Sequence, residues 1–139
     1  MTRPPLVKDF PLSETRPDEF IGPRGRRLAD ITAEAITAGT IAIEDLSITP
    51  EALLAQAAIA RDAGRAALAA NFTRAADLVG IPNDVIMATY DLLRPGRTTS
   101  RAALEERARM LRHEYGADVI AAFIEEAARE YQRRGLVTK

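Results

Sequence analysis

The chain of 139 residues carries 19 basic and 20 acidic residues, lacks cysteine and tryptophan, and contains 26 alanines. The net charge of −1 argues against a dedicated nucleic-acid binder, because such proteins present a clearly positive surface. The lack of cysteine excludes disulfides and thiolate chemistry, and no apolar run approaches the roughly 18 residues of a membrane span.

The first 49 residues predict an irregular N-terminal arm. Five of the eight prolines lie there, and that density disfavours helices and favours extended chain and turns. Phe20-Ile21 and Leu28–Ile31 flank the sequence Gly-Pro-Arg-Gly, which allows a short hairpin. A short helix is expected from Thr32, as the N-cap, to Ala38, with Gly39 ending it.

Helical patterns begin at Thr49. Thr49-Pro50-Glu51 combines a capping hydroxyl, a proline at the first helical position and an acid at the positive end of the helix dipole. Gly64 is expected to break or bend this helix. In the next helix the apolar residues fall on one stripe that Gly80 ends: Leu68, Phe72, Ala75 and Val79.

Three further helices are predicted after Pro82. The first runs from Val85 to Leu93 with Asn83 or Asp84 as its cap. Thr98, Thr99 or Ser100 caps the second, whose core stripe is Leu104, Ala108, Leu111 and Tyr115. Gly116 precedes the third, which is amphipathic, with an apolar side of Ile120, Phe123, Ile124, Ala127 and Tyr131.

The predicted fold class is therefore all-α, a small open up-and-down helical bundle of residues 50–139 preceded by the Pro/Gly-rich arm of residues 1–49. The turns are short, so consecutive helices should pack antiparallel. Because alanine supplies little apolar bulk, part of the stability is expected to come from a partner.

No residue pattern predicts catalysis, cofactor binding or a metal site in this chain. His113 is the one histidine, and it projects away from the stripe of its helix. The paired acids, such as Glu125-Glu126, are adjacent on a helix and so do not share a face. Neither of the glycine-rich phosphate-binding motifs, G-x-G-x-x-G and G-x-x-x-x-G-K-S/T, is present.

Several residues are instead candidates for an interface with another protein. Phe10, Leu12, Phe20 and Ile21 are scattered apolar residues of an extended arm, which suits insertion into pockets of a partner. We therefore expect the arm to lie on a partner while the helices fold among themselves. Asn71 either cross-links helices or reaches another subunit.

Arg94 and Arg97 belong to a cluster around a helix junction. They could bind phosphate at the N-terminus of the following helix, or pair with acids and backbone carbonyls at a protein interface. We favour the interface, because arginine is enriched at protein interfaces. A DNA-binding helix-turn-helix over residues 65–93 is disfavoured, because its recognition helix would present Asp84 and Asp91 to the DNA.

The run ITPEALLAQAAIARDAGRAALAANFTRAADLVGIPNDVIMATYDLLRP, residues 48–95, resembles the small (γ) subunit of adenosylcobalamin-dependent diol and glycerol dehydratases. KDFPL near the start, LADIT after a turn, and AAFIEEAAREY near the end are similar to the same family in the same order. The resemblance covers nearly the whole chain.

This resemblance implies a non-catalytic subunit of a lyase that converts 1,2-propanediol or glycerol to an aldehyde and water by radical chemistry. It implies a large TIM-barrel subunit that carries the substrate site, and a medium subunit. Adenosylcobalamin would lie between those two, and the holoenzyme would be a dimer of heterotrimers. The chain lacks the D-x-H-x-x-G cobalamin-ligand motif. The remaining alternatives are a free-standing helical adaptor and a small DNA-binding regulator.

A cytoplasmic location is expected, because the start MTRPPLVKDF contains no secretory h-region. Some members of the similar family carry a long N-terminal extension linked to microcompartments. Here KDFPL begins at Lys8, so we expect no packaging through such an extension.

Overall fold

The structure, a computed structural model, describes residues 2–138. Within them the regular elements are α-helices and short 3₁₀ helices with no β-strand, which confirms the all-α prediction. In chain order they are η1 (Val7–Asp9), α1 (Leu12–Thr15), η2 (Leu28–Asp30), α2 (Ala33–Thr37), η3 (Ile43–Leu46), α3 (Pro50–Asp62), α4 (Ala66–Leu78), α5 (Asn83–Leu93), α6 (Arg101–Tyr115) and α7 (Asp118–Arg133).

The contacts of the chain divide it into two compact units, Met1–Val79 and Gly80–Lys139. The predicted boundary at residue 49 between an arm and a bundle stays a prediction. No helix within residues 2–138 is both long enough and apolar enough to cross a membrane.

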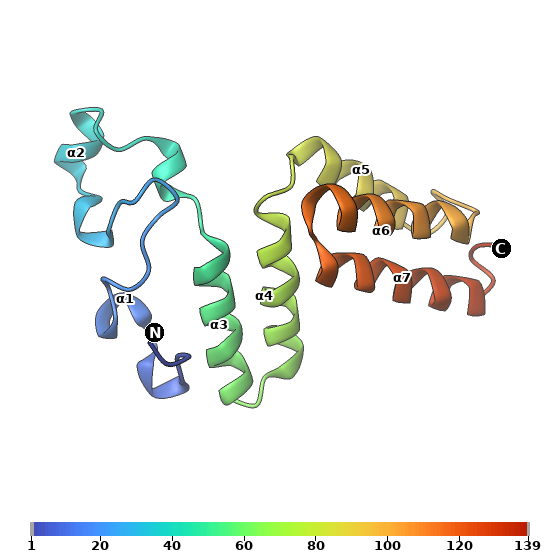
Figure 1. The fold of residues 1–139 in the computed structure, drawn as a ribbon, viewed down its shortest axis with the longest axis horizontal. Helices are drawn as coiled ribbons and strands as arrows, with labels where there is room; N and C mark the ends of the chain where they lie inside the picture. The colour runs from blue at the N-terminus through green and yellow to red at the C-terminus, as the bar shows by residue number, and fades with distance from the viewer. Residues whose placement is uncertain (1, 139) are drawn as a thin grey trace. The chain divides into compact units, whose positions relative to one another are not determined.

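In the first unit α3 and α4 lie side by side (Figure 1). The Thr49 hydroxyl caps α3 by accepting from the Ala52 N–H at 3.2 Å. Gly64, at φ +75°, separates the two helices, which confirms the predicted break. A β-carbon at Gly64 would meet no atom within 4 Å, so backbone conformation, not close packing, explains this glycine.

The start of the arm packs on α3 of its own chain, which the sequence did not predict, while the expectation that the arm lies on a partner stays a prediction. The Val7 N–H donates to the Asp62 carboxylate at 2.9 Å, and η1 contacts α3. Leu12 packs with Ala55 and Ile59 of α3, and Phe20 covers that cluster. A lone extended segment buries too little surface to stay ordered, and α3 supplies the apolar surface on which this one lies.

The predicted hairpin around Gly-Pro-Arg-Gly is absent from the described residues. A turn forms there, closed by a hydrogen bond of 2.8 Å from the Gly22 N–H to the Arg26 carbonyl. The Asp30 carboxylate then accepts from the Arg27 N–H at 2.8 Å and closes η2 where a second strand would begin. The helix predicted from Thr32 is confirmed as α2, capped by the Thr32 hydroxyl.

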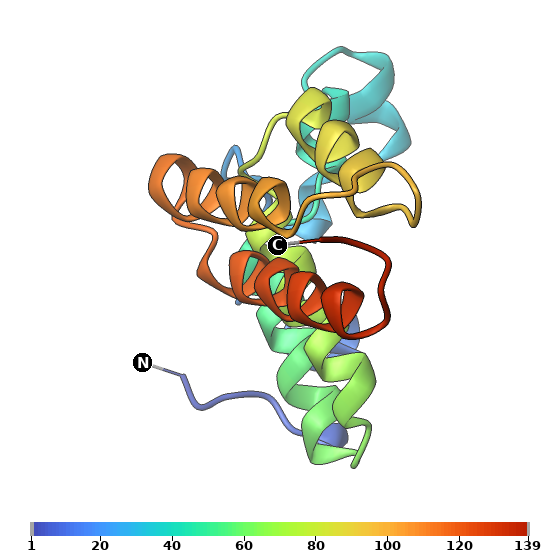
Figure 2. The ribbon, with the colours of Figure 1, turned by 90° about the vertical axis from the view of Figure 1, so that its right-hand side faces the viewer.

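In the second unit α6 and α7 form a helical hairpin (Figure 2). Leu104, Leu111 and Ile124 are its largest fully buried side chains. Ser100 caps α6, as predicted, by accepting from the Ala103 N–H at 3.3 Å. Gly116 joins the two helices in the left-handed conformation, at φ +63°.

Two sequence predictions for this unit are wrong. Helix α5 begins at Asn83 after Pro82 without a side-chain cap, because Asn83 already lies in the helix. Phe123, predicted on the apolar side of α7, is 39% exposed. Ile120 and Ile124 of that predicted side are buried, together with Ala121 and Ala128, whose small side chains allow the close approach of α6.

Candidate subunit interface

The four predicted anchors of the arm divide into two that face inward and two that face outward. Leu12 is 8% exposed and Phe20 is half-buried against the cluster on α3. Phe10 is 60% exposed and Ile21 is 48% exposed. Leu12 and Phe20 therefore attach the arm to its own chain, whereas Phe10 and Ile21 are accessible to another one.

The arm also exposes aliphatic side chains that are not among the predicted interface residues. Between residues 21 and 49 only Ile41 and Asp45 are buried. Five aliphatic side chains there are 49–74% exposed: Leu28, Ile36, Ile43, Leu46 and Ile48. Concentrated apolar exposure is typical of an interaction surface. For Ile43, Leu46 and Ile48 the available sequence signal was the lack of any predicted helix or strand that could bury them.

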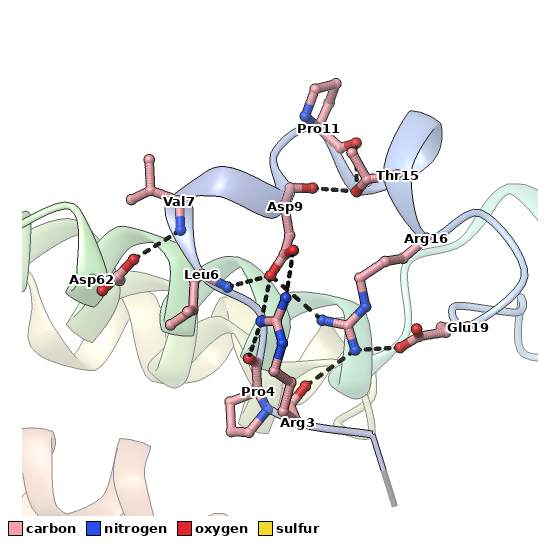
Figure 3. Close-up of polar contacts among 10 residues, drawn as sticks. All are labelled: Arg3, Pro4, Leu6, Val7, Asp9, Pro11, Thr15, Arg16, Glu19 and Asp62. Atoms are coloured by element: carbon pink, nitrogen blue, oxygen red, sulfur yellow. Dashed lines mark hydrogen bonds and ion pairs between the residues drawn. The ribbon is translucent and has the colours of Figure 1, made fainter.

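Asp9 fixes the conformation at the start of the arm (Figure 3). Its carboxylate accepts two hydrogen bonds from the Arg3 guanidinium, at 2.6 and 2.7 Å, and one from the Leu6 N–H at 2.8 Å. Arg16 lies 3.9 Å from the same carboxylate and also pairs with Glu19. These hydrogen bonds hold the pKa of Asp9 well below its ordinary value; those from Arg3 have the largest effect and that from the Leu6 N–H the next largest.

A hollow of about 330 Å³ opens where η1 meets α3 and α4. We call it the η1–α3–α4 hollow. Its apolar walls include Val7 and Phe10 from the arm, Ile59 from α3, and Leu68 and Phe72 from α4. Its polar wall residues are Gln56 and Arg65.

The predicted Leu68–Val79 stripe is not fully buried, because part of it lines the hollow. Leu68 and Phe72 are only half-buried, and Val79 is 42% exposed. Ala69 is the one residue of α4 that is classed as buried. An alanine on the packed face lets α3 and α4 approach closely, so the larger side chains of the stripe lie at the edge of the contact.

Asn71 does not cross-link helices. It is exposed on α4 and accepts a hydrogen bond from Arg74, one turn further along the same helix. The amide is therefore held within α4, and its place in an interface stays a prediction.

The arginines near the start of α6 have different surroundings. Arg94 lies 3.5 Å from Asp91, one turn back on the chain. Arg101 donates to Glu105 at 2.6 Å and to Gln132 at 2.5 Å, and so links α6 to α7. Arg97 is exposed, and no ion pair of its side chain occurs within residues 2–138. Of the three, Arg97 is the cation most available to a partner.

The histidine and the adjacent acids that the sequence offers lie apart from one another in the described residues. His113 is exposed on α6, and residues 2–138 hold no group of three or more His, Cys, Asp or Glu side chains arranged to bind a metal. Of the adjacent acids, Glu125 accepts from Arg112 of α6 at 2.7 and 3.2 Å, and these hydrogen bonds lower its pKa. That carboxylate stabilises the α6–α7 hairpin and is poorly suited to proton transfer.

Comparison with known proteins identifies the family of this chain. The model of the dehydratase small subunit family matches residues 6–138. The chain belongs to this family. The propanediol dehydratase small subunit of Salmonella typhimurium is 41% identical over 133 residues, which are 96% of this chain and 76% of the relative. The propanediol dehydratase small subunit of Citrobacter freundii is 41% identical over 128 residues, which are 92% and 74% of the two chains.

Membership of the dehydratase small subunit family confirms the resemblance seen in residues 48–95. A dehydratase small subunit has other dehydratase subunits as partners. The exposed apolar residues of the arm are thus candidates for contact with those subunits.

Proposed function

We propose that this dehydratase small subunit is the non-catalytic small subunit of a propanediol or glycerol dehydratase. The complete lyase would convert a 1,2-diol or glycerol to an aldehyde and water. The observation that carries this proposal is the 41% identity over 96% of the chain to a propanediol dehydratase small subunit.

The proposed role of the chain is to pack on the large catalytic subunit and stabilise it. The large subunit would be a TIM barrel, and a medium subunit would complete a heterotrimer that pairs into a dimer of heterotrimers. The outward residues of the arm, above all Phe10 and Ile21, support this role. Their burial on a partner would remove apolar surface from water, which is the main favourable term in most protein association.

Adenosylcobalamin would be held by the other subunits of the holoenzyme and supply its radical chemistry. The exposed His113 and the ion-paired Glu125 support this assignment, because neither offers this chain a cofactor site. We place the holoenzyme in the cytoplasm, where a bacterial microcompartment would be one setting for it.

Reconstitution tests this proposal. The purified chain, given adenosylcobalamin and 1,2-propanediol or glycerol, should release no aldehyde. Added to purified large and medium subunits, it should co-purify with them and increase either the rate of aldehyde formation or the lifetime of activity. Turnover by the chain alone, or failure to associate with the other two subunits, would contradict the proposal.

A further inference from the structure

We propose that the η1–α3–α4 hollow receives an apolar side chain of the large dehydratase subunit, beside an acidic group that pairs with Arg65. This inference rests on the proposed function and deepens it. At this position the small subunit provides the pocket, and the large subunit provides the inserted residue.

The walls of the hollow are fixed before any partner binds. The Val7 N–H donates to Asp62 at the end of α3, which holds η1 against the helix. Asp9 then secures the arm through its hydrogen bonds with Arg3 and Leu6 (Figure 3). The remaining walls belong to α3 and α4. A preformed pocket binds with little loss of conformational entropy, so a residue inserted there contributes strongly to affinity.

The size and lining of the hollow suit one large side chain. A volume of about 330 Å³ lies at the small end of the range for ligand pockets. Val7 and Phe10 are 44% and 60% exposed, while Ile59 is 8% exposed, so the hollow has a buried floor and an open apolar rim. Apolar anchors that fill such pockets at interfaces commonly carry a large share of the binding energy.

The charge at the rim of the hollow indicates which kind of partner group would lie beside the inserted apolar residue. Arg65 is exposed and lines the hollow, and no ion pair of its side chain occurs within residues 2–138. By contrast, Arg3 and Arg16 of the same unit are paired with Asp9 and Glu19. Arg65 is therefore a free cation at this rim. A carboxylate on the partner would match it and set the orientation of docking.

Two substitutions in the full-length chain test the proposal against matched controls. Ala63 also lines the hollow, so Ala63→Trp places an indole on its wall, and Arg65→Glu reverses the charge at its rim. Ala122→Trp on an exposed position of α7 controls for the added bulk. Arg61→Glu, on an exposed position of α3 outside the lining of the hollow, controls for the change in charge.

Binding of each variant to a purified complex of large and medium subunits is measured by titration, with melting temperatures to verify folding. We expect Ala63→Trp and Arg65→Glu each to raise Kd about tenfold or more, the range of an interface hot spot. The two controls should stay within about threefold. The effect of Arg65→Glu should shrink at high salt, because an exposed ion pair is screened.

The outcomes separate this inference from the proposed function. If the wild-type chain fails to bind the other subunits, the proposed function is wrong. If the wild type binds and both hollow variants bind equally well, the hollow is not the docking site and the proposed function stands. Should Ala63→Trp fail to fold, Arg65→Glu alone decides. Native mass spectrometry showing that Ala63→Trp abolishes self-association or displaces a small ligand, with Kd unchanged, would also overturn the inference.

Discussion

Leu104 and Phe72 each belong to a predicted apolar stripe, yet their environments differ. Leu104 is 0% exposed between α6 and α7, whereas Phe72 is half-buried and lines the η1–α3–α4 hollow. The 3.6-residue period indicates which residues share a helix face. It does not reveal whether another element covers that face. The free energy of truncation should follow burial in the structure and not membership of a stripe.

Alanine substitution at the two positions should therefore have unequal effects. Leu104→Ala is expected to lower the free energy of unfolding by about 2–5 kcal/mol, the range for a fully buried leucine. Phe72→Ala should cost only about 1–2 kcal/mol, because its ring is only partly buried. Met87→Ala, at a side chain that is 58% exposed, serves as the control. Urea denaturation followed by circular dichroism measures all three, and a larger loss for Phe72→Ala than for Leu104→Ala would contradict the assignment of burial.

Asp9 should make the stability of the first unit depend on acid pH. Its folded-state pKa lies below the ordinary value of 3.8. Its stabilising effect is therefore fully present above that value and is lost as pH falls through the folded-state pKa. Melting temperatures of the wild type and Asp9→Asn should differ by a constant amount from neutral pH to about pH 4, and the difference should shrink below that. Asp18→Asn, at an exposed acid of the same arm, is the control. A difference unchanged down to about pH 2 would show that the Asp9 charge is unimportant.

At the scale of elements, the sequence predicts best where the determinants are local. Thr32, Thr49 and Ser100 cap their helices as expected, because a cap needs only a hydroxyl three residues before an N–H. The failures have non-local or competing causes. At Gly22–Ile31 the Asp30 carboxylate closes a 3₁₀ turn in place of strand pairing, and Phe123 lies off the face of α7 that α6 covers.

The link between α6 and α7 should depend on the glycine at position 116. Its φ of +63° is one that residues with a side chain rarely adopt, so Gly116→Ala should destabilise the second unit by roughly 1 kcal/mol. Gly80→Ala is a matched control, because Gly80 has no positive φ and space for a methyl group. It should be neutral or stabilising by about 0.4–1 kcal/mol. Thermal unfolding of both variants checks this, and equal effects would exclude a conformational role for Gly116.

At the scale of the whole molecule, the sequence indicated an all-α chain and a family. It did not indicate that the arm packs on α3. That arrangement depends on contacts such as Val7 with Asp62, which are 55 residues apart, and no periodic pattern reports such pairs. The same reason explains the missed hollow, whose walls come from three separate segments. Phe10 and Ile21 are exposed, as insertion into a partner requires, but their place in an interface stays a prediction, and the hollow beside Phe10 was not predicted.

Deletion of residues 1–30 should consequently affect the two units differently. The truncated chain loses Leu12 and Phe20 from the cover of α3, along with the Val7–Asp62 hydrogen bond. Amide hydrogens of α3 and α4 should then exchange faster with solvent, because protection follows local stability. Those of α6 and α7 should be unchanged, since that hairpin has its own buried residues in Leu111 and Ile124.

The same deletion should weaken binding to the large subunit through two separate losses. It removes outward residues that lie outside the lining of the hollow, such as Ile21 and Leu28, and it dismantles one wall of the η1–α3–α4 hollow. The double variant Ile21→Ala/Leu28→Ala in the full-length chain removes only the first set of contacts, because neither residue lines the hollow or belongs to the Leu12 cluster. Titration against the complex of large and medium subunits should rank affinity as wild type, then double variant, then deletion. If the deletion bound as tightly as the wild type, neither residues 1–30 nor the complete hollow could contribute to the interface, and the contact would have to lie on the remaining residues, where Ile36, Ile43, Leu46 and Ile48 are exposed.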